Sequence, residues 1–364
     1  MKRTRLVVIG PVPPPRHGVT ISTALVLSNP LLRERFDVIH LDTSDRRGRE
    51  NIGAWDFANV RGGLAALARL VSLLRRGRGI VYLPISQSAP GFLRDSLFIL
   101  AAGMRRGWRV AVHLRGSELH DFYSAASRPL RFWIRLTVAR VDSLAVMGES
   151  VRHAVRDLVP PSRIAVVPNG TSDPGPSRGP RNVSTVLFLS NLLRRKGVRE
   201  AVEAALIVVD RHPSAQFIFA GDWEDDGLER ELRLRAQPAG DRIRFVGSVD
   251  DDEKRDLLLS SGMLLFPPVR PEGHPRVVIE GLAAGLPLIT TDRGTIAETV
   301  GPEGAAFVLD EPTPEALADC VLSVLADDEL RVRMGAAARA RFLSRYTQEA
   351  ADRRLADWLL EVDG

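Results

Sequence analysis

The chain has 364 residues, which is too long for one ordinary hydrophobic core, so two domains are expected. Of these residues 45% are hydrophobic and 26% charged, a composition typical of a globular protein. No apolar run approaches the roughly 18 residues of a membrane span, and the single cysteine, Cys320, excludes a disulfide framework. These features predict a cytoplasmic protein in which Cys320 is a small buried hydrophobic residue.

The charge is divided unevenly along the chain. Residues 1–170 contain 26 lysines and arginines against 12 acidic residues, whereas residues 171–364 contain 24 against 33, and the total is +5. An anionic partner is therefore expected for the first half. The basic residues are not interleaved with stacking aromatic residues and no nucleic-acid-binding motif is present. We therefore expect an anionic membrane surface or a phosphorylated lipid, and no nucleic acid.

Short apolar runs bounded by turn residues alternate with helical patterns, which predicts parallel, doubly wound α/β sheets. Strands are predicted at Leu6–Ile9, Val38–Leu41, Ile80–Leu83, Val110–Leu114, Leu144–Met147 and Ile164–Val167, and then at Thr185–Ser190, Phe217–Ala220, Ile243–Val246, Met263–Phe266, Leu288–Thr290 and Ala306–Leu309. Helical patterns include Val198–Val209, Leu317–Leu325 and the tail Tyr346–Leu360. The Gly- and Pro-rich segment Thr171–Pro180 separates two Rossmann-like domains, residues 1–172 and 173–345.

Two features of the first half are candidates for ligand binding. The loop Gly10–Thr20 follows the first strand, and Gly18 at the start of the next helix would let the backbone approach a phosphate closely. The alternative for this proline-rich loop is a rigid turn. His113 ends a predicted strand, where a lone histidine is more often structural than functional, and both interpretations stay open.

The loop Ser190–Val198 follows the first strand of the second half. Lys196 precedes a helix and could reach a diphosphate as a point charge, with Arg194 or Arg195 assisting. The alternative is a solvated basic patch.

The most informative segment is Pro271–Pro287, which places Glu272 in a Gly/Pro loop and Glu280 inside an apolar helix eight positions later. The loop follows a predicted parallel strand, so Glu272 is expected at the carboxyl edge of the sheet, where open α/β sheets bind ligands. The helix that opens near Pro275 offers free N–H groups to a phosphate. Carboxylates beside a phosphate-binding site predict a sugar nucleotide as the ligand.

Other acidic residues read as helix caps rather than as metal ligands. Asp225 and Asp226, and the run Asp250–Asp252, precede helical patterns. No Gly-x-Ser-x-Gly, His-Glu-x-x-His or Walker motif is present, which argues against hydrolases and P-loop enzymes. No metal site and no cofactor are predicted.

Taken together, these stretches resemble the retaining nucleotide-sugar glycosyltransferases of family 4, which have the two-domain GT-B fold. The resemblance covers nearly the whole chain and is carried by Gly10–Val19, His113 with Gly116 and Ser117, Val167–Gly170, Phe188–Gly197, Phe245–Gly247, Glu272–Glu280 and Thr290–Glu298. It implies two Rossmann-like domains facing a cleft, with residues 346–364 packing back on the first domain.

The resemblance also implies roles for the matching residues. Glu272 would bind donor-sugar hydroxyls, Glu280 the ribose, and Lys196 the diphosphate, with help from Gly18 and from the N–H groups after His274, those of Arg276 and Val277. His113 would lie beside the reacting sugar, and Val246 to Val249 would border the base. Two positions depart from the family pattern. Asn191 stands where arginine is frequent, so Arg194 or Arg195 would have to replace it, and Pro275 lacks an N–H.

The expected reaction is transfer of a hexose from a UDP- or GDP-sugar, with retention, to a glycan acceptor that is lipid-linked, in envelope or exopolysaccharide synthesis. Asp251 and Lys254 hint at guanine, and Thr43–Phe57 and Ser86–Asp95 are expected to face the acceptor. The alternative enzyme is a GT-B sugar-nucleotide 2-epimerase.

Peripheral membrane attachment is expected through Arg128–Arg140, where Arg128, Arg131 and Arg135 share one helix face beside Phe132 and Trp133. Arg75, Arg76, Arg78, Arg105 and Arg106 would add to the same positive potential.

Overall fold

The computed structural model describes residues 3–14, 18–44, 57–75, 77–176 and 179–364. Most of the predicted acceptor segment Thr43–Phe57, part of the Gly10–Thr20 loop and Arg76 therefore lie outside the described residues. The chain forms two compact units. Unit 1 comprises Met1–Pro168 and Glu349–Gly364, and unit 2 comprises Asn169–Gln348.

Unit 1 contains a six-stranded parallel sheet. Its strands are β1 (Thr4–Gly10), β2 (Phe36–Asp42), β3 (Gly79–Pro84), β4 (Trp108–Leu114), β5 (Ser143–Val146) and β6 (Ile164–Val166), in the order β2-β1-β3-β4-β5-β6. The chain order reverses between β1 and β3, which makes this the switch point of the sheet.

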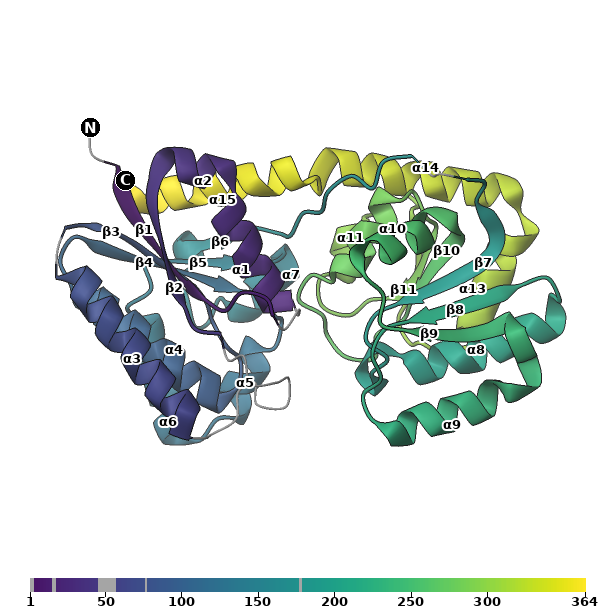
Figure 1. The fold of residues 1–364 in the computed structure, drawn as a ribbon, viewed down its shortest axis with the longest axis horizontal. Helices are drawn as coiled ribbons and strands as arrows, with labels where there is room; N and C mark the ends of the chain where they lie inside the picture. Colours follow the sequence, from purple (N-terminus) through teal and green to yellow (C-terminus); the bar gives the residue numbers. More distant parts are fainter. Residues whose placement is uncertain (1–2, 15–17, 45–56, 76, 177–178) are drawn as a thin grey trace. The chain divides into compact units, whose positions relative to one another are not determined.

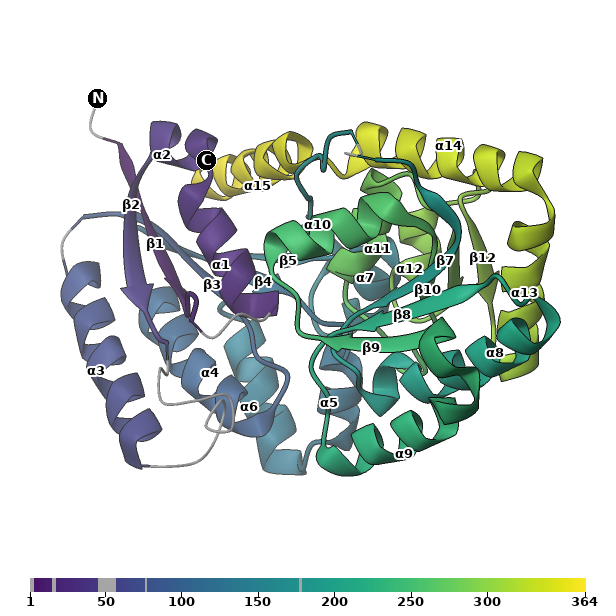
Figure 2. The same ribbon diagram turned by 45° about the vertical axis from the view of Figure 1, so that its right-hand side comes forward.

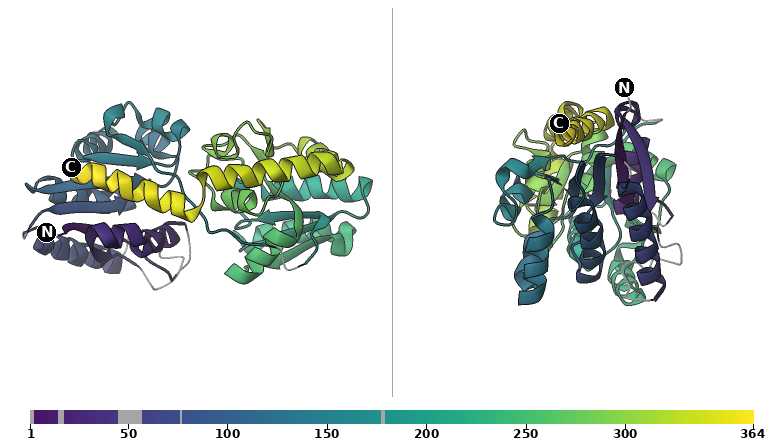
Figure 3. Two further views of the ribbon diagram at one scale, coloured as in Figure 1. Left: turned by 90° about the horizontal axis from the view of Figure 1, so that it is seen from above. Right: turned by 90° about the vertical axis from the view of Figure 1, so that its left-hand side faces the viewer.

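Helices cover both faces of the unit 1 sheet (Figures 1 and 3). One face packs against α3 (Phe57–Leu74), α4 (Ala89–Gly103), α5 (Leu119–Ala125), α6 (Arg128–Val138) and α7 (Glu149–Val155). The other packs against α1 (Gly18–Ser28), α2 (Pro30–Arg35) and the C-terminal helix α15 (Gln348–Asp363), whose Trp358 and Leu359 are buried in the core of this face. Because adjacent strand residues face opposite sides, Val7 and Val81 belong to the first core and Leu6 and Tyr82 to the second.

Unit 2 contains the second six-stranded parallel sheet. Its strands are β7 (Asn182–Leu189), β8 (Gln216–Ala220), β9 (Ile243–Gly247), β10 (Ser261–Phe266), β11 (Leu288–Thr291) and β12 (Ala306–Leu309), in the order β12-β11-β10-β7-β8-β9. This is the strand order of the dinucleotide-binding Rossmann fold, with its switch point between β7 and β10. Helices α8 (Val198–Arg211), α9 (Asp226–Ala236) and α13 (Pro314–Ala326) pack on one face, and α10 (Asp251–Ser260), α11 (Arg276–Ala283), α12 (Ile296–Val300) and α14 (Asp328–Arg345) on the other (Figure 2).

The predicted fold class is confirmed, and all predicted strands fall on strands of the structure. The helices that were expected to begin after Asp225 and Asp250 do so, and both carboxylates accept a backbone N–H from the first helical turn. Cys320 is half-buried rather than fully buried, at the margin of the α8–α13 core. None of the helices described has the length and apolar character needed to cross a membrane.

The two units divide earlier in the chain than the composition of Thr171–Pro180 suggests. Residues from Asn169 onward belong to unit 2, because Thr171 N–H donates to the Tyr346 carbonyl at 3.0 Å and the Asn169 amide donates to the His274 carbonyl at 3.0 Å. Hydrogen bonds of this kind leave no signal in local composition.

Candidate functional site

The switch point of unit 2 brings two loops together at the carboxyl edge of the sheet. Lys196 ends a 3-10 turn, Arg194–Lys196, in the loop after β7, and Glu272 lies in the loop after β10. The Lys196 Nζ donates to Glu272 Oε2 at 2.6 Å, across 76 positions of sequence. Their side chains are only 14% and 10% exposed. The two residues that the sequence singled out for diphosphate and sugar are thus direct neighbours.

Backbone contacts hold these loops close. Gly197 has φ +74°, and a Cβ at this position would lie 1.9 Å from the Pro267 carbonyl oxygen. The Val269 N–H donates to the Arg195 carbonyl at 3.1 Å. A glycine is needed at position 197 both for its left-handed conformation and for this close approach.

A third segment, after β11, clamps the Glu272 loop from its other side. Gly294 has φ +70°, and a Cβ there would lie 1.9 Å from the Glu272 carbonyl oxygen. The Thr295 hydroxyl donates to the Gly273 carbonyl at 2.6 Å. Sequence reasoning assigned no individual role to Gly294 and Thr295, although both lie in Thr290–Glu298, one of the segments that carry the resemblance.

The Lys196–Glu272 pair has a carboxylate oxygen that can accept a hydrogen bond from a ligand. Burial lowers the pKa of Lys196, and the neighbouring Glu272 carboxylate opposes that shift. Glu272 Oε1 is buried and has no hydrogen-bond partner among the described residues. A buried carboxylate oxygen without a donor is costly, so this oxygen is well suited to accept a ligand hydroxyl.

The helix α11 begins next to this loop. Pro275 is its N-cap and carries no N–H, so the first backbone N–H groups of the helix are those of Arg276 and Val277. The loop before it is held by Asn169, whose amide donates to the His274 carbonyl at 3.0 Å, and by Arg276, whose guanidinium donates to the Gly170 carbonyl at 3.3 Å. The His274 side chain is buried, with its ring centroid 5.4 Å from that of Tyr346. Sequence reasoning missed this positioning role of Asn169.

Glu280 lies in the interior of α11 and is 13% exposed. Its Oε1 accepts from Lys254 Nζ of α10 at 3.0 Å, and Lys254 also lies 3.7 Å from Asp251. Of the residues predicted to border the base, Val246 is 44% exposed and Val249 packs partly against the core under α10 and α11.

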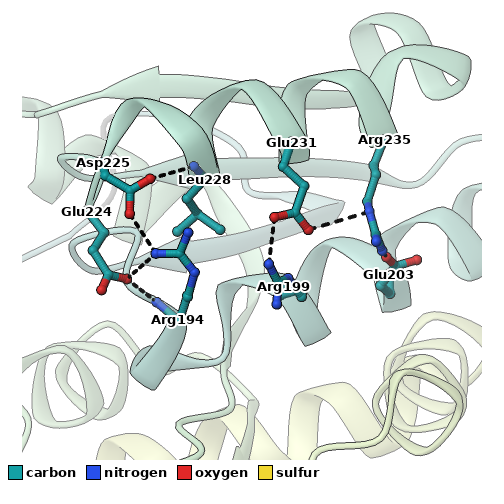
Figure 4. A network of polar contacts seen from close by, with 8 residues as sticks. All are labelled: Arg194, Arg199, Glu203, Glu224, Asp225, Leu228, Glu231 and Arg235. Carbon is teal, nitrogen blue, oxygen red and sulfur yellow. Dashed lines mark hydrogen bonds and ion pairs between the residues drawn. The ribbon is translucent and has the colours of Figure 1, made fainter.

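The two arginines beside Lys196 have different surroundings, and those of Arg194 are drawn in Figure 4. Arg194 donates to Asp225 at 2.6 Å, and Glu224 accepts from its backbone N–H at 2.8 Å. The Arg194 hydrogen bond, with the Leu228 N–H, lowers the pKa of Asp225 to about 2. Arg194 therefore ties the β7 loop to the start of α9, whereas Arg195 is exposed and no described residue pairs with its guanidinium. The assignment of Arg194 to the donor phosphate stays a prediction, and Arg195 is the less engaged of the two cations.

Ion pairs continue the same connection along α8 and α9 (Figure 4). Arg199 donates to Glu231 at 2.5 Å, and Arg235 lies 3.7 Å from Glu231 and also pairs with Glu203. These contacts hold α9 against α8, the helix that begins two residues after Lys196.

In unit 1, His113 lies at the end of β4 but its side chain points onto the face covered by α15. It is 1% exposed, its Nε2–H donates to the Val167 carbonyl at 3.2 Å, and its Nδ1 accepts from the Tyr82 hydroxyl at 3.1 Å. Its ring centroid is 5.8 Å from that of Trp358. Burial, and next the Arg115 charge, holds its pKa well below 6.5, so the ring is neutral at pH 7. This environment is the one expected for a structural histidine, which is one of the two interpretations that the sequence left open. A catalytic role for His113 stays a prediction.

The other unit 1 candidates lie at the carboxyl ends of β1 and β3. Gly18 opens α1 and is exposed, with no atom within 4 Å of the position that a Cβ would take. In the Ser86–Asp95 segment, buried Asp95 accepts from the Ser86 N–H at 2.9 Å and from Arg94. The Gln87 side chain accepts from the Glu118 N–H at 2.5 Å, which links the loops after β3 and β4.

No group of three or more His, Cys, Asp or Glu side chains among the described residues is arranged to hold a metal ion. At the carboxyl edge of unit 2, the described residues provide a buried ammonium, two carboxylates and a helix N-terminus.

Comparisons with known proteins agree with this arrangement. Residues 174–341 match the family model described as glycosyl transferases group 1. A phosphatidylinositol N-acetylglucosaminyltransferase gpi3 subunit of Schizosaccharomyces pombe is 26% identical over 58% of this chain and 46% of its own length. A phosphatidyl-myo-inositol mannosyltransferase of Mycobacterium tuberculosis is 32% identical over 44% of this chain and 43% of its own. The aligned part of the chain thus spans less than half the length of these curated relatives.

Among solved structures, the crystal structure of Anabaena Alr3699/HepE in complex with UDP-glucose has a TM-score of 0.75 over 99% of this chain and 100% of that one, at 15% identity. At this identity, the likeness establishes the fold alone.

Proposed function

We propose that this chain, a GT-B glycosyltransferase whose residues 174–341 belong to the group 1 family, transfers a hexose from a nucleotide-sugar donor to a glycan acceptor. The observation that carries this proposal is the buried Lys196–Glu272 pair at the unit 2 switch point, with Glu272 Oε1 left without a donor. A ligand with both a diphosphate and sugar hydroxyls satisfies both members of this pair.

In the proposed complex, Lys196 turns from Glu272 to the diphosphate, joined by the N–H groups of Arg276 and Val277. Glu272 then accepts hydroxyls of the donor sugar, and Glu280, held by Lys254, accepts those of the ribose. Catalysis consists mainly of positioning and of stabilising the charge that develops on the leaving diphosphate. Transfer proceeds with retention, by attack from the face that the diphosphate leaves, and the diphosphate takes the acceptor proton. We expect no metal requirement.

The donor is a UDP- or GDP-hexose in this proposal. The Anabaena protein of the same fold was solved with UDP-glucose, whereas Lys254 and Asp251 near the proposed base edge are compatible with guanine. Thermal-shift measurements with UDP, GDP and their hexose derivatives decide between them, since a ligand that binds only the native state raises its stability.

The acceptor is proposed to be a lipid-linked glycan in envelope or exopolysaccharide synthesis. The names of both curated relatives given above include phosphatidylinositol, which is a lipid. The alternative function, a sugar-nucleotide 2-epimerase, needs several acid and base groups around one sugar. His113 does not favour it, because both of its ring nitrogens are engaged within unit 1.

The experiment that tests transfer measures free nucleoside diphosphate with and without a glycan acceptor. We expect nucleoside diphosphate to appear only when the acceptor is present, and the anomeric configuration of the product to be that of the donor. Conversion of the donor sugar without an acceptor would contradict transfer and support the epimerase.

We further propose that the protein works at the inner face of the membrane, attached through α6. Phe132 is 69% exposed on this helix, and Arg131 and Arg135 both lie over the Tyr123 ring. Trp133 does not contribute as the sequence suggested, because it packs against the core and its Nε1 donates to the Ser96 hydroxyl at 2.8 Å. The proposed contact therefore consists of basic side chains around a single exposed aromatic ring.

Vesicle co-sedimentation tests the attachment. Binding should require anionic lipid, fall with salt, and weaken when Arg128, Arg131 and Arg135 are replaced by glutamine, since each basic residue near an anionic surface contributes about 1 kcal/mol. The matched control replaces three exposed arginines elsewhere, Arg69, Arg230 and Arg353. Equal binding to neutral vesicles, or an equal loss in the control, would contradict a role for α6.

A further inference from the structure

A basic hollow of about 790 Å³ lies in unit 1 at the amino-terminal edge of its sheet. It is lined by the first residues of β3 and β4 and by the segments that follow α4 and α6. Its lining contains six arginines, Arg78, Arg105, Arg106, Arg109, Arg140 and Arg163, but only two acidic residues, Asp142 and Asp363.

Most of this positive charge is not neutralised locally. Asp142 is already engaged, by Arg109 at 3.1 Å and by the Val110 N–H at 2.8 Å. No carboxylate among the described residues pairs with Arg78, Arg105, Arg106 or Arg140, all of which are exposed. The hollow therefore has a surplus of positive charge.

The ordinary explanation for arginines after a helix is that they complement the negative end of its dipole. Arg105 follows α4 and Arg140 follows α6, so the explanation applies to both. Each helix end carries only about half an elementary charge, however, so two ends offset about one positive charge. Six arginines against two carboxylates leave a surplus well above that.

A second observation points to a ligand with acceptor oxygens. Trp108 lines the hollow and is 5% exposed, and its indole Nε1 is buried without a hydrogen-bond partner among the described residues. Buried N–H groups are nearly always paired, because an unpaired one costs about 1–3 kcal/mol. An oxygen of a bound anion would supply the acceptor.

None of the residues that line the hollow belongs to the candidate site of unit 2, and Arg128, Arg131 and Arg135 of α6 are not among them. The strands of unit 1 run from this edge to the carboxyl edge, and seven residues of β4 span about 23 Å at 3.3 Å per residue. Arg128 is the first residue of α6, whose 11 residues span about 16 Å, and Arg140 follows the last residue of that helix. Arg135 lies between them, in the last turn of α6. Of the basic residues that the sequence grouped into one potential, Arg78, Arg105 and Arg106 line the hollow, whereas Arg128, Arg131 and Arg135 do not.

We propose that this hollow is a binding site for a phosphate-bearing anion with two or more negative charges. Guanidinium groups bind phosphate oxygens in paired hydrogen bonds, which fits a cluster of arginines better than a single cation would. The phosphate belongs either to a soluble molecule or to the headgroup of an anionic lipid. The site lies outside the transfer chemistry, so it stands whether or not the proposed function is correct.

Titration calorimetry of the full chain with inorganic pyrophosphate tests the proposal. Pyrophosphate also resembles the diphosphate of a donor, so the measurement is made in a Lys196→Gln background, which removes the main cation of the unit 2 site. We expect binding that weakens with added NaCl and that falls at least tenfold when Arg105, Arg106 and Arg140 become glutamine. The control with glutamine at Arg69, Arg230 and Arg353 should keep the original affinity. All of these arginines are exposed, so the variants should fold normally, which circular dichroism can verify.

Tryptophan fluorescence gives a direct readout of the hollow itself. Pyrophosphate should change the emission of the Lys196→Gln protein, and this change should disappear in a Trp108→Phe variant. In a parallel arm, vesicles of phosphatidylglycerol replace pyrophosphate, and vesicles of phosphatidylcholine serve as the neutral control. A response in either arm that depends on Arg105, Arg106 and Arg140 supports the proposal and identifies the source of the phosphate. No response in both arms, or a response of equal strength in the triple variant, would overturn it.

Discussion

Replacing Glu272 with glutamine should separate recognition of the donor sugar from recognition of the nucleotide. The two oxygens of this carboxylate differ in their hydrogen bonding. Oε2 accepts from Lys196 at 2.6 Å, whereas Oε1 is buried and has no described donor. Glutamine keeps the shape and one acceptor oxygen but removes the negative charge, so the loop geometry is preserved while the bond to a sugar hydroxyl is weakened.

The size of the effect follows from the type of hydrogen bond that is lost. A hydrogen bond to a charged group is worth about 1.5–3 kcal/mol, which corresponds to a fall of about 10- to 150-fold in kcat/KM. The nucleoside diphosphate should behave differently. Without its carboxylate partner, Lys196 stays buried beside an uncharged amide, and an incoming diphosphate becomes its only strong counter-charge. Affinity for nucleoside diphosphate should therefore be unchanged or higher.

Two assays measure the two halves of this prediction: initial rates of nucleoside diphosphate release with donor and acceptor, and titration calorimetry with nucleoside diphosphate alone. Glu315→Gln, an exposed glutamate in the first turn of α13, is the control for loss of one carboxylate and should change neither quantity. The reasoning is refuted if Glu272→Gln keeps full kcat/KM, or if it weakens nucleoside diphosphate binding as strongly as it weakens transfer.

Three further predictions follow from the same contacts. Glu280→Ala should weaken nucleoside diphosphate binding by about 1–3 kcal/mol in calorimetry, because a ribose hydroxyl loses its acceptor; an unchanged affinity would remove Glu280 from the site. Gly197→Ala should lower both the melting temperature and donor affinity, because its Cβ would meet the Pro267 carbonyl, whereas Gly304→Ala, at φ +83° with no atom within 4 Å, carries only the conformational cost of about 1–2 kcal/mol; equal effects would show that the loop contact is unimportant. For His113, the folded pKa lies below the unfolded value near 6.5, so its contribution to stability is present above that pH and is lost as the pH falls. Urea unfolding between pH 7.5 and 5.5 should show a component of at most about 1.4 kcal/mol per pH unit that is absent in His113→Gln, and an identical pH profile in the variant would contradict the buried neutral ring.

The sequence by itself determined the elements of this protein and the composition of its candidate site. Alternating apolar runs and turn residues located the strands, because a buried parallel strand must be apolar over its short length. Asp225 and Asp250 marked helix starts because their side chains satisfy N–H groups of the first turn. Lys196 and Glu272 stood out because each lies in a loop between a predicted strand and a helix, at a sheet edge, and Glu280 stood out as a carboxylate inside an apolar helix eight positions after Glu272.

Only the tertiary structure decided which of these groups meet. Lys196 and Glu272 are neighbours because the strand order places β7 beside β10, which no local pattern encodes. Arg194 and Arg195 are adjacent in sequence, yet the first is held by Asp225 at the start of α9 and the second is exposed. His113 lies at a strand end, as predicted, but a strand end has two faces, and the packing of Trp358 from the far end of the chain makes its face an interior one. Strand and helix propensity arise from neighbours along the chain, whereas pairing, burial and the orientation of a side chain arise from residues that only folding brings within a few ångströms.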